Sequence, residues 1–311
     1  MIAFGPVPSR RLGRSLGINN IPPKVCSYSC VYCQVGRTSK LQIARQQFFS
    51  TEEIFQETRF RVRQVQQLGE RIDYLSFVPD GEPTLDVQLG KEIDLLRTLD
   101  IKIAVITNSS LLWIPRVRHE LCKADVVSIK LDTLDESAWH RLNRPHRRLS
   151  LDNILEGILF FRKEYHGQLL SETMLIRGMN EDELMLQQLA DFLGRLKPAK
   201  AYLSIPIRPP AEKHIRPISE KNLIRAYEIF REKIQAVELL TGEEGDEFAF
   251  TGDAENDLLS ITAVHPMRKE AVQVLLRRAG QDWSMVQKLI RQGKLKEIKH
   301  KGQYFLVRKI A

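Results

Sequence analysis

The sequence predicts an α/β fold: a partial (βα)6, TIM-like barrel followed by a small C-terminal winged-helix-like module. Three observations support this prediction. Short β-branched runs alternate with stretches of helical periodicity over the first 210 residues, which is typical of a parallel sheet. Polar residues directly follow most of these runs, where parallel α/β folds place their chemistry. A basic segment with a different pattern comes after the last run.

Six runs are expected to form the strands, at 15–21, 74–78, 102–107, 125–131, 171–176 and 201–207. Helices are expected between them, at 51–68, 86–99, 111–123, 151–165 and 182–196. Ser50 and Glu53 have the spacing of a capping box before the first helix, and Gly69 stands where a C-terminal glycine belongs. Six units favour an incomplete barrel over a closed eightfold one. An open doubly wound sheet is the alternative, because spacing does not fix strand order.

The rest of the chain has a different organisation. A helix is expected over 219–240, followed by an acidic connector at 241–246. The pattern then predicts helices at 265–279 and 282–292 and a hairpin at 295–309, an order that fits a winged-helix-like module. We therefore divide the chain into a barrel at 1–210, a helical extension and linker at 211–259, and a basic module at 260–311.

The positive charge is concentrated in that last module. The whole chain has 47 Lys and Arg against 39 Asp and Glu, but residues 260–311 hold 12 of the former and 3 of the latter, a net charge of +9. A basic module beside a nearly neutral body suggests a surface that binds nucleic acid. A solvated helical face is the alternative interpretation.

The composition and the first residues predict a globular protein without membrane contact. With 43% hydrophobic and 28% charged residues, the chain is not of the disordered class. No apolar run approaches the roughly 18 residues of a membrane span, and the first residues lack the charged and apolar regions of a signal peptide. We therefore expect the protein in the cytoplasm.

Three of the four cysteines, Cys26, Cys30 and Cys33, lie within eight residues at C-x3-C-x2-C spacing. Such soft ligands suit an iron-sulfur cluster or zinc, and four cysteines are too few for a disulfide framework. No further Cys or His follows within eighty residues, so zinc would need the distant His119 or Cys122 as a fourth ligand. Three thiolates on a [4Fe-4S] cube leave one iron open for a substrate or cofactor.

This spacing, with Tyr32 directly before the last cysteine, resembles the cluster loop of the radical S-adenosylmethionine (SAM) superfamily. The resemblance implies a [4Fe-4S] cluster on Cys26, Cys30 and Cys33 with SAM bound to the open iron. It further implies that one electron cleaves SAM to methionine and a 5′-deoxyadenosyl radical, which abstracts hydrogen from the substrate. A reducing electron donor such as flavodoxin or ferredoxin is implied as a partner.

A second segment matches the same superfamily. Asp80, Gly81, Glu82 and Pro83 are similar to its glycine-glycine-glutamate motif, with Asp80 in place of the first glycine. Glycine would let the backbone approach the methionyl amine, and Glu82 would accept a hydrogen bond from that ammonium. Taken alone, Asp-Gly is also common in β-turns.

Further SAM contacts are expected where later strands end. The resemblance implies that Asn108 and Ser109 face the ribose hydroxyls, and that Lys130 or Asp132 faces the ribose or the carboxylate. A polar strand end can also be only a capped loop.

Two more arginines are expected at the cofactor. The resemblance implies that Arg144 pairs with the methionyl carboxylate. It implies that residues 176–179, including Arg177, pack on adenine. Arginines in 5–14 and 34–38 flank the cysteines, and they suit a phosphate or carboxylate substrate or are simply solvated. No residue that acts on the substrate itself is identified.

Residues 5–38, 80–85, 130–132 and 172–180 together resemble the subfamily grouped with the wyosine synthetases of transfer RNA. Those enzymes carry a second cysteine set, whereas only Cys122 lies outside the loop in this chain. The resemblance predicts a radical SAM enzyme with transfer RNA or another nucleotide as substrate. The alternatives are a radical activase or small-molecule-modifying enzyme, and a non-enzymatic iron-sulfur or zinc DNA-binding regulator.

Overall fold

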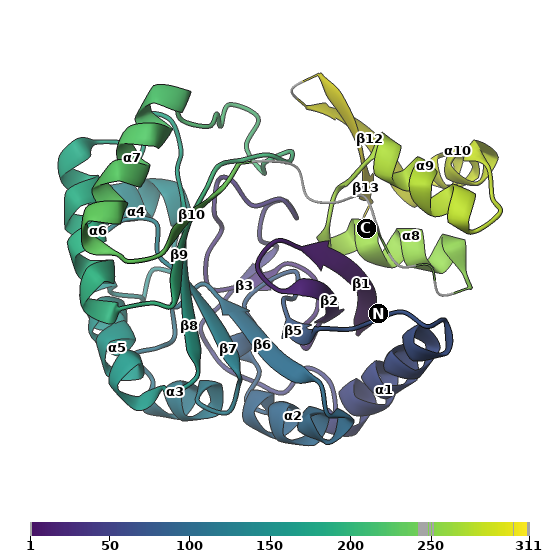
Figure 1. The fold of residues 1–311 in the computed structure, drawn as a ribbon, viewed down its shortest axis with the longest axis horizontal. Coiled ribbons are helices and arrows are strands. Elements are labelled where there is room, and N and C mark those ends of the chain that lie inside the picture. Colours follow the sequence, from purple (N-terminus) through teal and green to yellow (C-terminus); the bar gives the residue numbers. More distant parts are fainter. Residues whose placement is uncertain (1, 242–247, 249, 251, 301, 310–311) are drawn as a thin grey trace.

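The chain curls an eight-stranded sheet into an open barrel (Figure 1). The computed structural model describes residues 2–241, 248, 250, 252–300 and 302–309. In spatial order the strands are β1 (Ala3–Ser9), β2 (Gly13–Ile18), β5 (Tyr74–Phe77), β6 (Lys102–Thr107), β7 (Val126–Lys130), β8 (Gln168–Met174), β9 (Lys200–Ser204) and β10 (Val237–Leu240). Strands β2 to β10 pair in parallel, and β1 runs antiparallel to β2.

The order of the strands confirms the predicted partial barrel. Spatial order follows chain order from β2 to β10, whereas a doubly wound sheet reverses its order at a switch point. The six predicted strands are all present, and β1 and β10 extend the sheet at its two ends. The single helix predicted over 219–240 is wrong in its second half. Helix α7 (Glu220–Lys233) ends before β10, whose Val237 pairs with Ala201 of β9.

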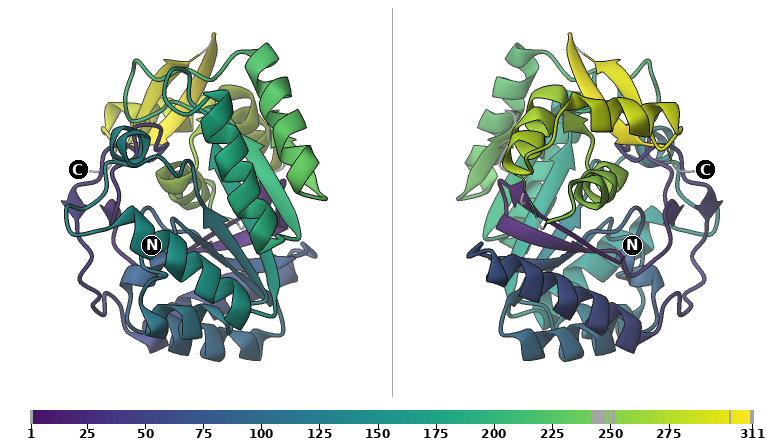
Figure 2. Two further views of the ribbon diagram at one scale, coloured as in Figure 1. Left: turned by 90° about the vertical axis from the view of Figure 1, so that its left-hand side faces the viewer. Right: turned by 90° about the vertical axis from the view of Figure 1, so that its right-hand side faces the viewer.

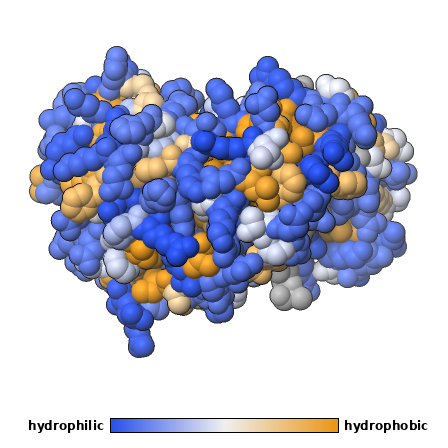
Figure 3. Space-filling model, turned by 90° about the horizontal axis from the view of Figure 1, so that it is seen from below, coloured by the Kyte–Doolittle hydropathy of each residue, from blue (hydrophilic) through white to orange (hydrophobic). Residues whose placement is uncertain are grey.

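Helices cover the outer face of the barrel (Figures 1 and 2). They are α1 (Thr51–Gln67), α2 (Leu89–Leu96), α3 (Pro115–Leu121), α4 (Glu136–Asn143), α5 (Leu151–Glu164), α6 (Glu183–Leu196) and α7. Side chains of Ser50, Asp135, Ser150, Asp182 and Ser219 cap five of these helices at their first turn. Hydrophilic side chains cover most of the face seen from below, with apolar ones in separate groups (Figure 3).

Two further predicted helices are shorter than expected, and one helix of the barrel was not predicted. Within residues 86–99, α2 is followed by the short 3-10 turn η2 (Arg97–Leu99). A second such turn, η1 (Pro83–Leu85), directly precedes this segment. The helix expected at 111–123 begins only at Pro115, because proline fits the first helical turn. Helix α4 follows β7 directly, and its N-cap Asp135 is the signal that the sequence offered for it.

The C-terminal part has its own small core. It consists of α8 (Ala254–Val264), β11 (Met267–Arg268), α9 (Lys269–Arg278), α10 (Trp283–Arg291), β12 (Leu295–His300) and β13 (Gln303–Arg308), with sheet order β11-β13-β12. The predicted helix, helix and hairpin are present, with α9 starting later than expected, whereas α8 was missed. Its Leu258 and Ile261 belong to this core, so α8 spans the predicted boundary at 260. The boundaries and the winged-helix character remain predictions, and the connector at 241–246 lies almost wholly outside the described residues.

The C-terminal part packs against the β1 end of the barrel (Figure 1). Helix α8 lies on β1, and Val7 of β1 packs against the C-terminal core. Arg61 of α1 donates to the carbonyl of Gly5 (3.0 Å) and forms an ion pair with Asp257 of α8. The side chain of Asp257 is fully buried and that of Arg61 is 8% exposed, so this pair is desolvated. Among the described residues, no helix could cross a membrane.

Replacing Asp257 by Ala should lower the free energy of unfolding by about 3 kcal/mol, because it leaves a buried guanidinium without its carboxylate. The measurement is urea unfolding followed by circular dichroism. The double variant Arg61→Met, Asp257→Leu should recover much of the loss. A single variant as stable as the wild type would show that the pair does not join the two parts.

Candidate functional site

The three cysteines lie on a loop at the mouth of the barrel. Cys26 ends β3 (Val25–Cys26), which pairs with β4 (Lys40–Leu41), and Cys30 and Cys33 follow in the intervening loop. The loop is tied to the end of α4, where Ser29 N donates to Asn143 O (2.9 Å) and Val31 N to Leu142 O (2.9 Å). All three thiols are free. The loop is therefore held by backbone bonds to a neighbouring βα unit.

Two side-chain amides donate to the sulfurs. Nδ2 of Asn108 lies 3.5 Å from Sγ of Cys26, and Nδ2 of Asn143 lies 3.4 Å from Sγ of Cys30. Burial raises the pKa of Cys30 to about 12 despite the bond from Asn143, and it also raises the pKa of Cys26 and of Cys33. Thiolates here therefore need added positive charge, which a metal cluster supplies. Donors to sulfur are also a means by which proteins stabilise an iron-sulfur cluster, so these residues fit one.

The cysteines do not converge as the ligands of a single ion. Among the described residues, no group of three or more His, Cys, Asp or Glu side chains is placed to hold one metal ion. In a cubane each cysteine binds its own iron, so a cubane does not require convergence on one point.

Gly81 allows a close approach between two loops. Lys24 N donates to Asp80 O (2.7 Å), and Glu82 N donates to Val25 O (3.2 Å). A Cβ at Gly81 would overlap the carbonyl oxygen of Val25, directly before Cys26. The resemblance predicts that this glycine lets the backbone approach the methionyl amine, and that remains a prediction. The backbone that Gly81 itself approaches is that of the cysteine loop.

The carboxylate of Glu82 is buried and serves mainly to join elements. It accepts bonds from Thr84 N (3.1 Å), Thr84 Oγ1 (2.6 Å), Thr107 Oγ1 (2.6 Å) and Asn108 N (2.7 Å). Burial raises the pKa of Glu82, and these four bonds act in the opposite direction. Oε2 accepts only the bond from Asn108 among the described residues. Pro83 begins η1, and its carbonyl accepts a bond from Asn20 Nδ2 (3.2 Å).

Asn108, Lys130 and Asp132 meet beside the cysteine loop, around a small cavity that Tyr28 and Asn143 also line. Asp132 accepts bonds from the Tyr32 hydroxyl, from Asn143 Nδ2 (2.8 Å) and from Met174 N (2.9 Å). Lys130 Nζ lies 4.8 Å from the centre of the Tyr32 ring. Tyr32 thus anchors the loop to the end of β7. Ser109 is buried and left-handed (φ 68°), with no hydrogen-bond partner for Oγ in the described part of the chain.

Arg144 and Arg177 are not brought to this group. Nη1 of Arg144 lies 2.5 Å from Oε1 of Glu212, and Arg37 makes two further bonds of 3.0 Å to the same carboxylate. These bonds from Arg37 and Arg144 lower the pKa of Glu212 to about 2. Arg177 is exposed, and its N–H donates to Arg216 O (3.0 Å). Neither arginine lines the small cavity or the larger one beside it.

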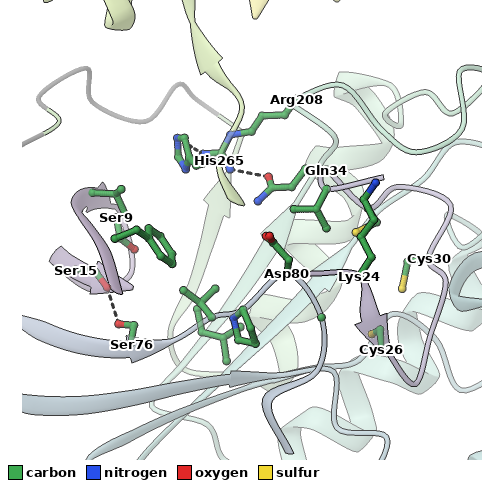
Figure 4. Close-up of a pocket in the computed structure, with 18 of the residues that line it drawn as sticks. Ser9, Ser15, Lys24, Cys26, Cys30, Gln34, Ser76, Asp80, Arg208 and His265 are labelled. Carbon is green, nitrogen blue, oxygen red and sulfur yellow. Dashed lines mark hydrogen bonds between the residues drawn. The ribbon is translucent and has the colours of Figure 1, made fainter. Parts of the chain in front are cut away.

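The larger cavity, of about 240 Å³, is lined by all three cysteines. Figure 4 shows it with Cys26 and Cys30 labelled. Its far side holds Arg208, whose Nη1 lies 2.6 Å from Oε1 of Gln34 and whose Nη2 lies 2.9 Å from Nε2 of His265. Asp80 lies between, and burial raises the pKa of its carboxyl to about 7. Sequence reasoning missed Asn143, Arg208 and His265. Arg208 follows a predicted strand, which was a usable signal, whereas nothing local placed a C-terminal histidine at the barrel mouth.

Comparison with known proteins gives a consistent result. The model of the Radical SAM superfamily matches residues 20–193. A UPF0026 protein of Methanocaldococcus jannaschii is 48% identical over 311 residues, covering 99% of this chain and 96% of that protein. Two solved structures have the same fold at 16% identity and a TM-score of 0.54. They are TYW1 with a lysine-pyruvate adduct bound, covering 71% of this chain and 74% of that one, and a radical SAM methyltransferase from Sphaerobacter thermophilus, covering 74% and 67%.

Replacing Gly81 by Ala should displace β3 and with it Cys26. We expect the variant to bind less than about a third of the wild-type iron and sulfide, since ligand geometry controls metal affinity. The measurement is iron and sulfide per chain after anaerobic reconstitution. Gly194→Ala on the outer helix α6 is the control, because its Cβ would meet atoms of Lys233, the nearest being the carbonyl oxygen at 3.0 Å. Full loading of Gly81→Ala would contradict this view of the loop contact.

Proposed function

The chain belongs to the radical SAM superfamily and is an enzyme, and we propose that it cleaves SAM reductively to abstract hydrogen from a nucleotide, in transfer RNA or another nucleic acid. A [4Fe-4S] cluster held by Cys26, Cys30 and Cys33 would supply the electron that splits SAM into methionine and a 5′-deoxyadenosyl radical. The observation that carries the proposal is the loop of three half-buried cysteines that line a cavity at the barrel mouth. Flavodoxin or ferredoxin is the proposed electron donor.

The residues around the sulfurs would hold and tune this cluster. Asn108 and Asn143 donate to Cys26 and Cys30, and such bonds stabilise negative charge on sulfur. Tyr32 fixes the loop through its bond to Asp132.

SAM is proposed to lie beside the small cavity. Asn108, Lys130 and Asp132 offer an amide, an ammonium and a carboxylate to its ribose and carboxylate groups. The remaining lone pair on Oε2 of Glu82 is directed to the methionyl ammonium in this proposal. Arg144 already forms an ion pair with Glu212, so we assign it to that pair and not to SAM.

A nucleic acid is the proposed substrate because exposed cations crowd the C-terminal part. They are Arg277, Arg278, Lys288, Arg291, Lys294, Lys296, Lys299, Arg308 and Lys309. Lys288 and Lys294 share Glu255, and the other exposed cations on α10 and the hairpin point to an anionic partner. Membership of the superfamily favours an enzyme over the non-enzymatic regulator.

Replacing Cys30 by Ala should abolish activity, because two thiolates hold a cube poorly. We expect iron, sulfide and the yield of 5′-deoxyadenosine with dithionite each to fall at least about tenfold. The measurement is chromatography of 5′-deoxyadenosine and methionine after anaerobic reconstitution. Cys122→Ala, at the end of α3, is the matched control and should behave as the wild type. Wild-type protein that holds iron but leaves SAM intact would refute the proposed reaction.

Binding of bulk transfer RNA should weaken steeply with salt. The double variant Lys296→Gln, Lys299→Gln should reduce the slope of log K against log salt by about 1 to 2. Binding that makes fewer phosphate contacts releases fewer counterions. The measurement is fluorescence anisotropy at several salt concentrations. The control double variant Lys91→Gln, Lys163→Gln removes exposed lysines of α2 and α5 and should keep the wild-type slope. Equal slopes in the two double variants would argue against a nucleic-acid surface on the hairpin.

A further inference from the structure

The cavity at the cysteines has an unsatisfied carboxylate on one wall. Asp80 is 3% exposed, and its Oδ1 has no hydrogen-bond partner within the described part of the chain. Figure 4 shows its carboxylate pointing into the space below Gln34 and Arg208, away from Cys26 and Cys30. A buried carboxylate oxygen without a donor is costly, so its position indicates a ligand that donates to it. Superfamily resemblance would place glycine here, so this carboxylate is a feature of this chain.

The opposite wall carries cations. Arg208 comes from the loop after β9 and reaches Gln34 and His265, while Arg11 comes from the turn between β1 and β2. Burial, together with the charges of Arg11 and Arg10, lowers the pKa of Arg208 to about 9. Burial also lowers the pKa of Arg11 to about 10, and Arg11 shares Glu172 with Lys130. An anion bound at this wall would relieve the repulsion among the arginines.

The walls between these two poles are apolar and hydroxylic. Phe4, Val7, Val78 and Pro79 line the cavity together with the hydroxyl-bearing Ser9. Arg208 also lies beside the C-terminal part, because it contacts His265, which directly follows α8. The cavity therefore offers an acceptor on Asp80, apolar surface on its walls, and the guanidinium of Arg208 at the side where the basic module begins.

We propose that this cavity binds one nucleotide of the substrate, with the base edge donating N–H groups to Asp80 and the phosphate facing Arg208 and Arg11. This inference rests on the proposed function and names the unit that enters the site. A flat base suits the apolar walls, a carboxylate accepts from base amino groups, and guanidinium groups match phosphate. The nucleotides that flank the bound nucleotide in the nucleic acid would continue over the basic C-terminal part. An amino acid with a polar side chain would also match the two charges, but it would leave the apolar walls without a partner.

The test separates the two poles with three probes: GMP, guanosine and ribose 5-phosphate. GMP is chosen because guanine presents two adjacent N–H donors to a carboxylate. Calorimetry on the reconstituted protein with SAM and without reductant should give a dissociation constant for GMP at least about tenfold below that of either part. Asp80→Asn should weaken GMP and guanosine by a similar factor and leave ribose 5-phosphate unchanged. Arg208→Gln should weaken GMP and ribose 5-phosphate and leave guanosine unchanged.

Matched controls and a rescue keep the result interpretable. Asp94→Asn and Arg148→Gln alter an exposed carboxylate and an exposed guanidinium, and both should bind the probes as the wild type does. Arg208→Lys keeps the charge and should retain part of the phosphate contribution even if the loop shifts.

Equal binding of GMP and guanosine would overturn the inference, and so would loss of ribose 5-phosphate binding in Asp80→Asn. Weaker SAM binding in Asp80→Asn would also overturn it, because it would reassign Asp80 to the cofactor. The proposed function is tested separately by SAM cleavage with dithionite. Protein that cleaves SAM but ignores GMP refutes only the nucleotide subsite. Protein that binds GMP as stated but leaves SAM intact refutes only the radical reaction.

Discussion

The site depends on one backbone contact that only glycine permits. At Gly81 the chain after β5 comes so close to β3 that the carbonyl of Val25 occupies the place of a side chain. Two backbone hydrogen bonds, Lys24 N to Asp80 O and Glu82 N to Val25 O, close this contact. Because Cys26 follows Val25 directly, the position of the first sulfur is set by the sheet itself. Glu82 extends the constraint to β6 by accepting bonds from Thr107 and Asn108.

Side-chain amides donate to the sulfurs of Cys26 and Cys30, and the same contact helps to position the first of them. Asn108 is fixed by Glu82 through its own N–H and reaches Cys26 with its side chain. Asn143 is fixed by Asp132 and reaches Cys30. Neutral donors stabilise a cluster without competing with it for the thiolates, whereas a lysine at this distance would form an ion pair with a thiolate when no metal is present. Desolvation raises the pKa of Cys30 to about 12, so its thiolate form would need positive charge from a bound metal.

Local patterns predicted the parts of this protein that local forces determine. The six strands were found because their apolar runs are short and β-branched, and the cysteine loop because its ligands are adjacent in sequence. Strand β1 was missed because Pro6 and Pro8 argue against a strand, although an edge strand tolerates them. β10 was missed because its apolar spacing also continues the pattern of α7, and the free edge of β9 decided between them.

Long-range partners were beyond sequence reasoning. Asn143 lies 113 positions from the cysteine that it contacts, and Arg144 is paired with an acid 68 positions away. No periodicity or motif reports such contacts, so an arginine near the site could only be interpreted as free for the cofactor. Asn108, Lys130 and Asp132 were found because parallel strands end at one edge, which makes their convergence a property of the topology.

Besides the packing of α8 on β1, two polar contacts among the described residues join the C-terminal part to the barrel, and together they fix how its charge can act. Near the outer helices, the buried pair of Arg61 and Asp257 ties α8 to α1. At the barrel mouth, His265 meets Arg208 at the edge of the cavity. A basic module on a flexible tether would raise only the local concentration of a nucleic acid, whereas one held at two points also fixes its direction. The positive charge of the described residues between 260 and 309 is thus positioned relative to the three sulfurs, on the side of the cavity where Arg208 lies.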